Sequence, residues 1–213
     1  MKVLSADFVT SAAAGGDTGG IPRDGVAHVA LAGRSNVGKS SLLNALFRRK
    51  IARTSAAPGK TRLANVYRAT VDGGPGGAGR WSVHLVDLPG YGYARGGPES
   101  AEELRLTSEA YFRALIEPPA GDARGVTRVM ALLLVDSRHP GMPSDQAAAR
   151  WLDQLGVPRH IVATKVDKLS RAERVRNLRE LERIFGTAAL PVSAESGEGL
   201  EELWQTIAKS ARK

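Results

Sequence analysis

The chain has 213 residues, of which 42% are hydrophobic and 24% charged, and this composition is typical of one globular domain. Its 30 Lys and Arg residues outnumber its 22 Asp and Glu residues, so the net charge is +8 and a phosphate-rich partner is favoured. It has no cysteine, which excludes disulfides and thiolate metal sites. The longest apolar run, residues 129–135, is far shorter than the roughly 20 residues that span a bilayer.

The first 25 residues predict a flexible lead-in. Residues 11–25 are small, glycine-rich and aperiodic, which indicates a linker. A secretion signal is not expected, because Asp7 interrupts the apolar stretch near the start. We therefore expect one domain over residues 26–213.

From residue 26 onward, strand patterns alternate with helix patterns. The predicted strands are residues 26–33, 63–72, 80–87, 128–136, 159–165 and 188–193. The predicted helices are residues 39–49, 99–117, 144–155, 170–185 and 199–213. The short glycine-rich connection 73–79 favours an antiparallel hairpin. The order predicts a three-layer α/β fold with a mostly parallel six-stranded sheet and one antiparallel edge strand.

The stretch GRSNVGKS, residues 33–40, has the phosphate-loop pattern and lies between a predicted strand and a predicted helix. Gly33 and Gly38 allow backbone N–H groups to approach phosphate oxygens. Lys39 is predicted to reach the β and γ phosphates, and Ser40 to offer its hydroxyl to Mg²⁺. The nucleotide-binding residues predicted here are Gly33, Arg34, Ser35, Asn36, Val37, Gly38, Lys39, Ser40 and Ser41.

A second motif, Asp87-Leu88-Pro89-Gly90, follows the predicted strand 80–87. In phosphate-loop enzymes this Asp commonly holds Mg²⁺, and the glycine N–H contacts the γ-phosphate. The next residue is Tyr91, where Ras-like enzymes usually carry a Gln that orients the attacking water. Because a phenol cannot replace that amide, we predict slow intrinsic hydrolysis and a Tyr91 side chain that can point away from the phosphates.

The base is expected to be read by Thr164-Lys165-Val166-Asp167 and by the loop after the last strand. A carboxylate accepts two hydrogen bonds from guanine and none from adenine, so Asp167 predicts selection of GTP over ATP. The stem of Lys165 can lie along the purine face. The loop residues expected to contact guanine are Val192, Ser193 and Ala194.

A polar loop between the first predicted helix and the hairpin contains Gly59, Lys60 and Thr61. We predict that the Thr61 hydroxyl joins Ser40 and Asp87 at Mg²⁺ when GTP is bound and is released after hydrolysis. Thr54 is the alternative for this role. Thr61 is preferred because it lies next to the strand.

Five stretches resemble the EngB family of ribosome-biogenesis GTP-binding proteins (also called YihA or YsxC) within the TrmE–Era–EngA–EngB–Septin-like group. They are GRSNVGKSSLLNAL, PGKTR, DLPGYGYA, LLLVDSRH and ATKVDKLS. The similarity covers residues 26–207, and DLPGYGYA is its most specific part. The resemblance implies a Ras-like GTPase fold, bound GTP and Mg²⁺, and a role in maturing the bacterial large ribosomal subunit. We also expect a monomer located in the cytoplasm.

The predicted catalytic residues are Lys39, Thr61 and Asn36. Asn36 resembles the asparagine that supports K⁺ in related GTPases, so K⁺ is one hypothesis for the missing catalytic charge; Arg95 or a ribosomal group is the other.

The alternatives for function are a GTP-dependent binding module for another RNA or for a cell-division (septation) partner, with incidental hydrolysis, and a phosphate-loop ATPase or kinase. Candidate RNA contacts are basic residues near Thr61 and at the C-terminus, whereas the arginines of residues 170–185 are equally well explained as a solvated face.

Overall fold

The computed structural model of the chain describes residues 1–12, 20–52, 63–74, 79–91, 98–117 and 127–211. One seven-stranded sheet, in the order β1-β3-β4-β2-β5-β6-β7, forms its middle layer. The strands are β1 (Lys2–Ala12), β2 (His28–Gly33), β3 (Ala64–Asp72), β4 (Arg80–Asp87), β5 (Val129–Asp136), β6 (Arg159–Thr164) and β7 (Leu190–Pro191). The helices are α1 (Lys39–Phe47), α2 (Pro98–Ile116), α3 (Pro143–Gln154), α4 (Arg171–Phe185) and α5 (Leu200–Ala211), with a short 3₁₀ turn, η2 (Val166–Lys168).

The predicted alternation of strands and helices is confirmed. β4, β2, β5, β6 and β7 run parallel to one another, and β3 pairs with β4 in an antiparallel hairpin. The central strands β2 and β5 are buried along almost their whole length, as their continuous hydrophobic runs indicate. Parallel strands all end at one edge of the sheet, so the loops that follow them lie close together.

The N-terminal segment corrects two predictions, the flexible lead-in and the six-stranded sheet. β1 pairs with β3 in antiparallel register, so β3 is not the edge strand. Beyond the strand, Ile21 is buried and Asp24 accepts hydrogen bonds from the side chains of Arg68 and His84. Residues 2–12 and 20–25 therefore pack on the sheet, and only residues 13–19 of the expected lead-in lie outside the described residues.

The pattern of β1 explains why the sequence hid this strand. Its apolar residues Leu4, Phe8 and Val9 are exposed, whereas the most buried position is the small Ala6. Two irregularities in the register, between Val3 and Ser5 and between Phe8 and Thr10, further break the alternation. The strand is stabilised by main-chain pairing and by the terminal amine, which donates to Glu201 of α5, and neither is visible in a hydrophobicity pattern.

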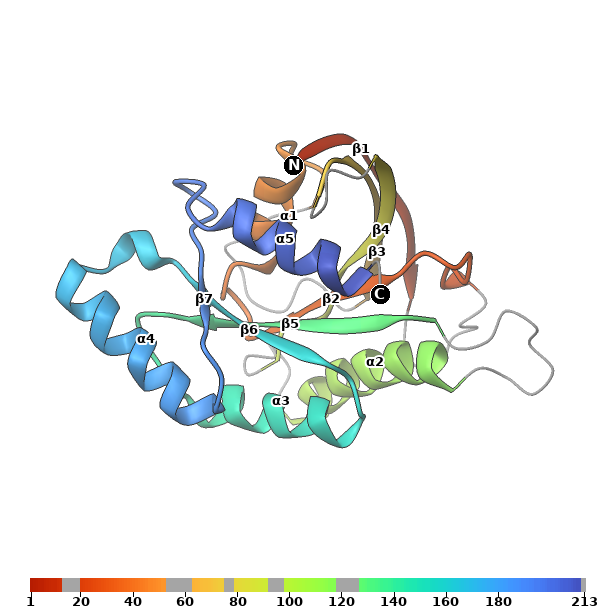
Figure 1. Cartoon of the computed structure of the whole chain (residues 1–213). Coiled ribbons are helices and arrows are strands. Elements are labelled where there is room, and N and C mark those ends of the chain that lie inside the picture. The colour runs from red at the N-terminus through yellow and green to blue at the C-terminus, as the bar shows by residue number, and fades with distance from the viewer. Residues whose placement is uncertain (13–19, 53–62, 75–78, 92–97, 118–126, 212–213) are drawn as a thin grey trace.

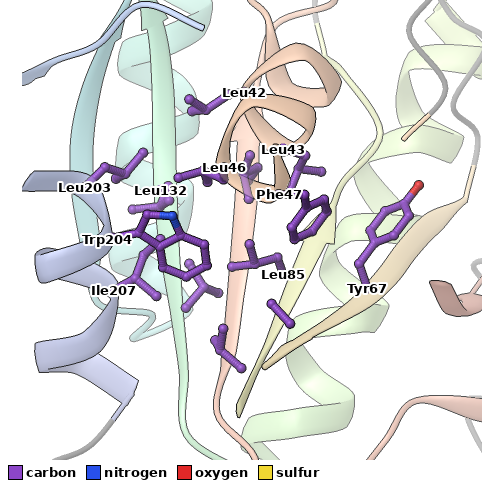
Figure 2. Packing of buried hydrophobic residues seen from close by; sticks show 14 of the residues in the cluster. Leu42, Leu43, Leu46, Phe47, Tyr67, Leu85, Leu132, Leu203, Trp204 and Ile207 are labelled. Atoms are coloured by element: carbon purple, nitrogen blue, oxygen red, sulfur yellow. The ribbon is translucent and has the colours of Figure 1, made fainter. Parts of the chain in front are cut away.

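Helices cover both faces of the sheet (Figure 1), with α1 and α5 on one face and α2, α3 and α4 on the other. Figure 2 shows the first layer, where Leu46 of α1 and Trp204 of α5 lie near Leu132 of β5, and Phe47 of α1 lies beside Leu85 and Tyr67. The second layer contains the aromatic residues of α2 and α3 and the last turns of α4. These two layers fix α1 and the strand ends relative to each other.

A capping box begins α4. The Ser170 hydroxyl accepts from the Glu173 backbone N–H, and the Glu173 carboxylate accepts from the Ser170 backbone N–H. Among the described residues, no helix is long and apolar enough to cross a membrane.

Candidate nucleotide-binding site

The predicted site residues follow the carboxyl ends of neighbouring strands. In the parallel register, Leu31 pairs with Asp87, and Asp136 pairs with Thr164. Gly33, the first residue of the phosphate loop, is the last residue of β2. Crevices at the carboxyl ends of parallel strands are where open α/β sheets bind ligands, so the fold brings these residues to the expected edge.

The phosphate loop has a backbone that few residue types can adopt. A Cβ on Gly33 would lie 2.8 Å from Val37 Cγ1 and 2.9 Å from the Leu134 carbonyl oxygen, so only glycine fits between the loop and β5. Asn36 and Gly38 both have positive φ, and Gly38 caps the N-terminus of α1. The loop therefore leads directly into the first turn of α1, where backbone N–H groups without helical partners favour the binding of an anion.

The Lys39 side chain is held against this loop. Its ammonium group donates to the carbonyl oxygens of Gly33 and Arg34 at 2.9 and 3.1 Å. Burial lowers the pKa of Lys39 to about 8, and the negative charge of Asp87 opposes that shift. A phosphate beside this cation would replace part of the water that burial removed.

Ser40 and Asp87 lie together at the start of α1. The Ser40 hydroxyl donates to Asp87 Oδ2 at 2.6 Å, whereas the buried Oδ1 has no hydrogen-bond partner among the described residues. Burial raises the pKa of Asp87, against the effects of Lys39 and Ser40. An unpaired buried carboxylate oxygen next to a hydroxyl fits a hard cation such as Mg²⁺, which takes oxygen ligands.

The segment after Asp87 lies directly on the phosphate loop. Leu88, Pro89 and Gly90 are buried, and a Cβ on Gly90 would lie 2.8 Å from Lys39 Nζ and 2.9 Å from Ser35 N. The next residue, Tyr91, accepts a hydrogen bond from Ser35 N through its carbonyl oxygen at 2.9 Å. Its hydroxyl donates to Asp145 of α3 at 3.0 Å, so the Tyr91 side chain is directed to α3.

Thr164 and Lys165 join the end of β6 to the phosphate loop. The Thr164 hydroxyl is within 2.9 Å of the Val37 carbonyl oxygen and 3.2 Å of that of Val135. The ammonium group of Lys165 donates to the Asn36 carbonyl oxygen at 2.7 Å and to Asp136 Oδ2 at 2.9 Å. These contacts connect the predicted phosphate-binding and base-binding segments.

The two segments predicted to read the base also meet. Val166 N donates to the Val192 carbonyl oxygen at 3.4 Å, and a hydrogen bond from the Ser193 hydroxyl, with help from Lys168, lowers the pKa of Asp167. The Asp167 side chain is partly exposed, pairs with Lys168 at 3.1 Å and is ionised at neutral pH, the form in which a carboxylate can accept from guanine. Ala194, directly after Ser193, is half-buried.

Several predicted residues lie outside the described part of the chain. They are Gly59, Lys60, Thr61, the alternative Thr54, and Arg95. Their proposed roles therefore stay predictions. Ser41 is described and is exposed on α1.

Sequence reasoning missed Asp145 and gave no role to Asp136. Asp145 is completely buried in the first turn of α3 and pairs with Arg34 of the phosphate loop. Asp136 accepts from Arg138 and Lys165, which lower its pKa despite its burial. The position of Asp136 at the end of a strand could have indicated a site residue, whereas Asp145 has the sequence surroundings of an ordinary acidic residue at the start of a helix.

The phosphate loop, the Asp87–Gly90 segment and the Thr164–Asp167 segment, placed at one edge of this sheet, define a phosphate-loop GTPase. The family model of the 50S ribosome-binding GTPases matches residues 28–165. The chain belongs to the EngB family of GTP-binding proteins. It is 41% identical to the probable GTP-binding protein EngB of Pelotomaculum thermopropionicum over 98% of this chain and 96% of that protein. It is also 41% identical to the one of Solibacter usitatus over 97% of this chain and 96% of that protein.

Solved structures show the same fold. A crystal structure of a probable GTP-binding protein EngB matches with a TM-score of 0.57 and 24% identity, over 87% of this chain and 99% of that one. Era, in complex with MgGDPNP and a segment of 16S ribosomal RNA, matches with a TM-score of 0.67 and 24% identity, over 88% of this chain and 57% of that one.

Proposed function

We propose that this GTPase is a GTP-gated assembly factor of the bacterial large ribosomal subunit, with slow intrinsic hydrolysis. The proposal is carried by one observation: the phosphate-loop, Asp87–Gly90 and Thr164–Asp167 segments meet at one edge of the sheet, in a chain that the family model of the 50S ribosome-binding GTPases matches. The proposed partner is a precursor of the large subunit, bound through rRNA and ribosomal proteins. A monomer in the cytoplasm, where that precursor is made, is the form expected to act.

The surface charge supports an RNA-containing partner. Five arginines lie on α4, and among the described residues only Arg174 and Arg183 form ion pairs, with Glu198 and Glu180. On α2, by contrast, Arg105 and Arg113 are both paired with glutamates. The three arginines of α4 without such pairs, which favour counterion release on RNA, are Arg171, Arg176 and Arg179.

Mg²⁺ is the proposed metal, held by Ser40 and Asp87 and, in the GTP state, by Thr61. The unpaired Asp87 Oδ1 supports this assignment. When bound, the ion neutralises charge on the phosphates. Lys39 supplies a second positive charge, and Gly90 can offer a backbone N–H to the γ-phosphate when the Gly90–Tyr91 segment moves.

The proposal of slow hydrolysis rests on Tyr91, whose hydroxyl donates to Asp145. Replacing Tyr91 by Ala should change the single-turnover rate of bound GTP by less than about threefold, because the residue does not position water. The measurement is GTP hydrolysis in a single turnover with saturating protein. Loss of hydrolysis with intact GTP binding would contradict the proposal.

K⁺ is proposed as the added catalytic charge, with Asn36 as its support. The positive φ of Asn36 and its exposed position in the loop are compatible with this role. Hydrolysis should then be faster in K⁺ than in Na⁺ at equal ionic strength, and Asn36→Ala should remove the difference. Equal rates in the two salts would refute this part and leave Arg95 or a ribosomal group as the source of charge.

The test of the assembly role is co-sedimentation of the protein with purified ribosomal subunits. Binding to the large subunit is expected with a non-hydrolysable GTP analogue and not with GDP, and the small subunit serves as the control. Binding that does not depend on the nucleotide would refute the switch.

The second candidate is a GTP-dependent binding module for another RNA or for a cell-division partner, in which hydrolysis is incidental. The same basic face of α4 favours it as much as it favours rRNA. GTP turnover that rises when pre-ribosomal particles are added would support the first candidate, and turnover indifferent to particles would support the second.

A further inference from the structure

A buried carboxylate on α3 touches two parts of the nucleotide site at once. Asp145 has no exposed side-chain surface, and both of its oxygens accept from Arg34 Nε, at 3.1 and 3.2 Å. Oδ1 also accepts from the Tyr91 hydroxyl at 3.0 Å. Arg34 belongs to the phosphate loop, and Tyr91 follows the Gly90 that must face a γ-phosphate, so one residue of α3 connects the two.

The protonation states of Tyr91 and Asp145 favour the hydrogen bond between them. Burial raises the pKa of Tyr91, and the negative charge of Asp145 raises it further, so the phenol stays protonated and remains a donor. Burial raises the pKa of Asp145, while Arg34 and the Tyr91 hydroxyl lower it. Hydrogen bonds to a buried charged group contribute more to stability than those between neutral groups.

The contact places the main chain of Gly90 and Tyr91 on the phosphate loop. Ser35 N donates to the Tyr91 carbonyl oxygen, and Arg34 and Tyr91 form an isolated parallel bridge. A Cβ on Gly90 would lie 2.8 Å from Lys39 Nζ, so Gly90 itself is in contact with the ammonium group that must receive the γ-phosphate. Gly90 lies so close to Lys39 that a γ-phosphate placed between the two would require this segment to move.

We propose that Asp145 is a positioning residue that, through Arg34 and the Tyr91 hydroxyl, holds the Gly90–Tyr91 segment on the phosphate loop and so favours GDP over GTP. GTP must displace the segment and lose this contact. A ligand shifts such an equilibrium only by its difference in affinity for the two conformations, so the contact lowers GTP affinity and leaves GDP affinity unchanged. The inference concerns the nucleotide site itself, and its meaning for regulation rests on the switch proposed above.

The test is the ratio of the affinities for a non-hydrolysable GTP analogue and for GDP, measured by titration of fluorescent nucleotides. Tyr91→Phe removes only the hydroxyl and keeps the ring that packs against the core. It should raise the ratio about tenfold, since one hydrogen bond to a charged group is lost from the GDP-favouring conformation. Asp145→Asn, which keeps the shape but loses the charge, should raise the ratio by a smaller factor.

Tyr111→Phe is the matched control. Tyr111 is a buried tyrosine whose hydroxyl bonds to His28, in the half of the sheet away from the phosphate loop, so its loss should leave the ratio unchanged. A ratio that stays constant or falls in Tyr91→Phe would overturn the inference, because a purely structural role changes both affinities alike. If the ratio rises but large-subunit binding is indifferent to the nucleotide, the proposed switch fails while the role of Asp145 stands.

Discussion

The two ends of the sheet both bury polar side chains, but they treat charge differently. At the carboxyl end of β2, the Lys39 ammonium group and the Asp87 carboxyl group are buried, and Asp87 has an oxygen without a partner among the described residues. At the opposite end, the His28 ring is neutral, since burial lowers its pKa to about 3. His28 contacts the Tyr111 hydroxyl at 2.5 Å and the Pro22 carbonyl oxygen at 3.0 Å.

Because of this difference, we expect the buried polar groups at one end of the sheet to contribute to ligand binding and those at the other end to contribute to the stability of the fold. Polar groups that the protein itself satisfies contribute to the folded state alone. Groups left charged and partly unpaired can be completed by a ligand, and the ligand proposed here is a phosphate group with its cation. Changes at the carboxyl end should therefore alter nucleotide affinity, and changes at the other end should alter the free energy of unfolding.

The largest effect is expected for Asp167→Ala. The variant loses two hydrogen bonds from guanine to a carboxylate, so the affinities for GTP and GDP should both fall by about a hundredfold or more. The Asp167 side chain is only 18% exposed, pairs with Lys168 and accepts from Ser193, so the free energy of unfolding without nucleotide should also fall, by about 1 kcal/mol. Glu195→Ala, which removes an exposed carboxylate beside Lys168, is the control and should keep both affinities. Calorimetric titration measures the affinities for GTP and GDP. An unchanged GTP affinity in Asp167→Ala would contradict the assignment of nucleotide binding to the carboxyl end of the sheet.

The next effect is the loss of stability in acid caused by His28. Its pKa is about 3 in the folded protein and near 6.5 in the unfolded chain, so only the unfolded chain binds a proton between these values. The free energy of unfolding should therefore decrease as the pH falls below about 6.5, by up to about 1.4 kcal/mol per pH unit from this group. His84, whose pKa burial also lowers, acts in the same direction.

Urea unfolding at pH 7 and pH 5.5 measures this effect. His28→Gln should be less stable at pH 7 and should show a weaker pH dependence. His139→Gln, a change at an exposed histidine, should keep the full dependence. An unchanged slope in His28→Gln would show that the acid effect comes from other groups.

The smallest effects come from one matched pair of hydroxyl deletions. Thr164→Val removes the buried hydroxyl that contacts the Val37 and Val135 carbonyl oxygens, and it should weaken GTP and GDP binding equally, by less than about tenfold. Tyr111→Phe removes the hydroxyl that contacts His28 and should cost about 1 kcal/mol of stability without changing either affinity. If the two variants had the same effect on affinity, the separation of the two ends would be wrong.

The sequence predicted the carboxyl end of the sheet well, because its signals are local. Gly33, Lys39 and Ser40 lie within one motif between a strand and a helix, and Asp87 and Asp167 follow their own strands directly. Motifs of this kind fix the backbone and the side chain together, so their position could be inferred without tertiary information.

The missed features depend on contacts between distant residues. Asp145 meets Arg34, 111 positions earlier in the chain, and its own surroundings in the sequence indicate only a helix start. β1 is stabilised by pairing with β3, whereas its exposed apolar residues hide the alternation of a strand. A sequence pattern therefore predicts whether a residue is buried better than it predicts which distant residue it contacts.

The claim that a nucleotide completes the carboxyl end of the sheet, whereas the protein itself satisfies the His28 ring at the other end, is tested most directly by thermal unfolding with and without saturating GDP. A ligand that binds only the folded state raises the unfolding temperature. We predict that Asp167→Ala unfolds at a slightly lower temperature without GDP, because it loses the contacts with Lys168 and Ser193, and that it also loses the shift. Tyr111→Phe should unfold at a lower temperature and keep the shift. A full shift in Asp167→Ala, or a lost shift in Tyr111→Phe, would contradict the account.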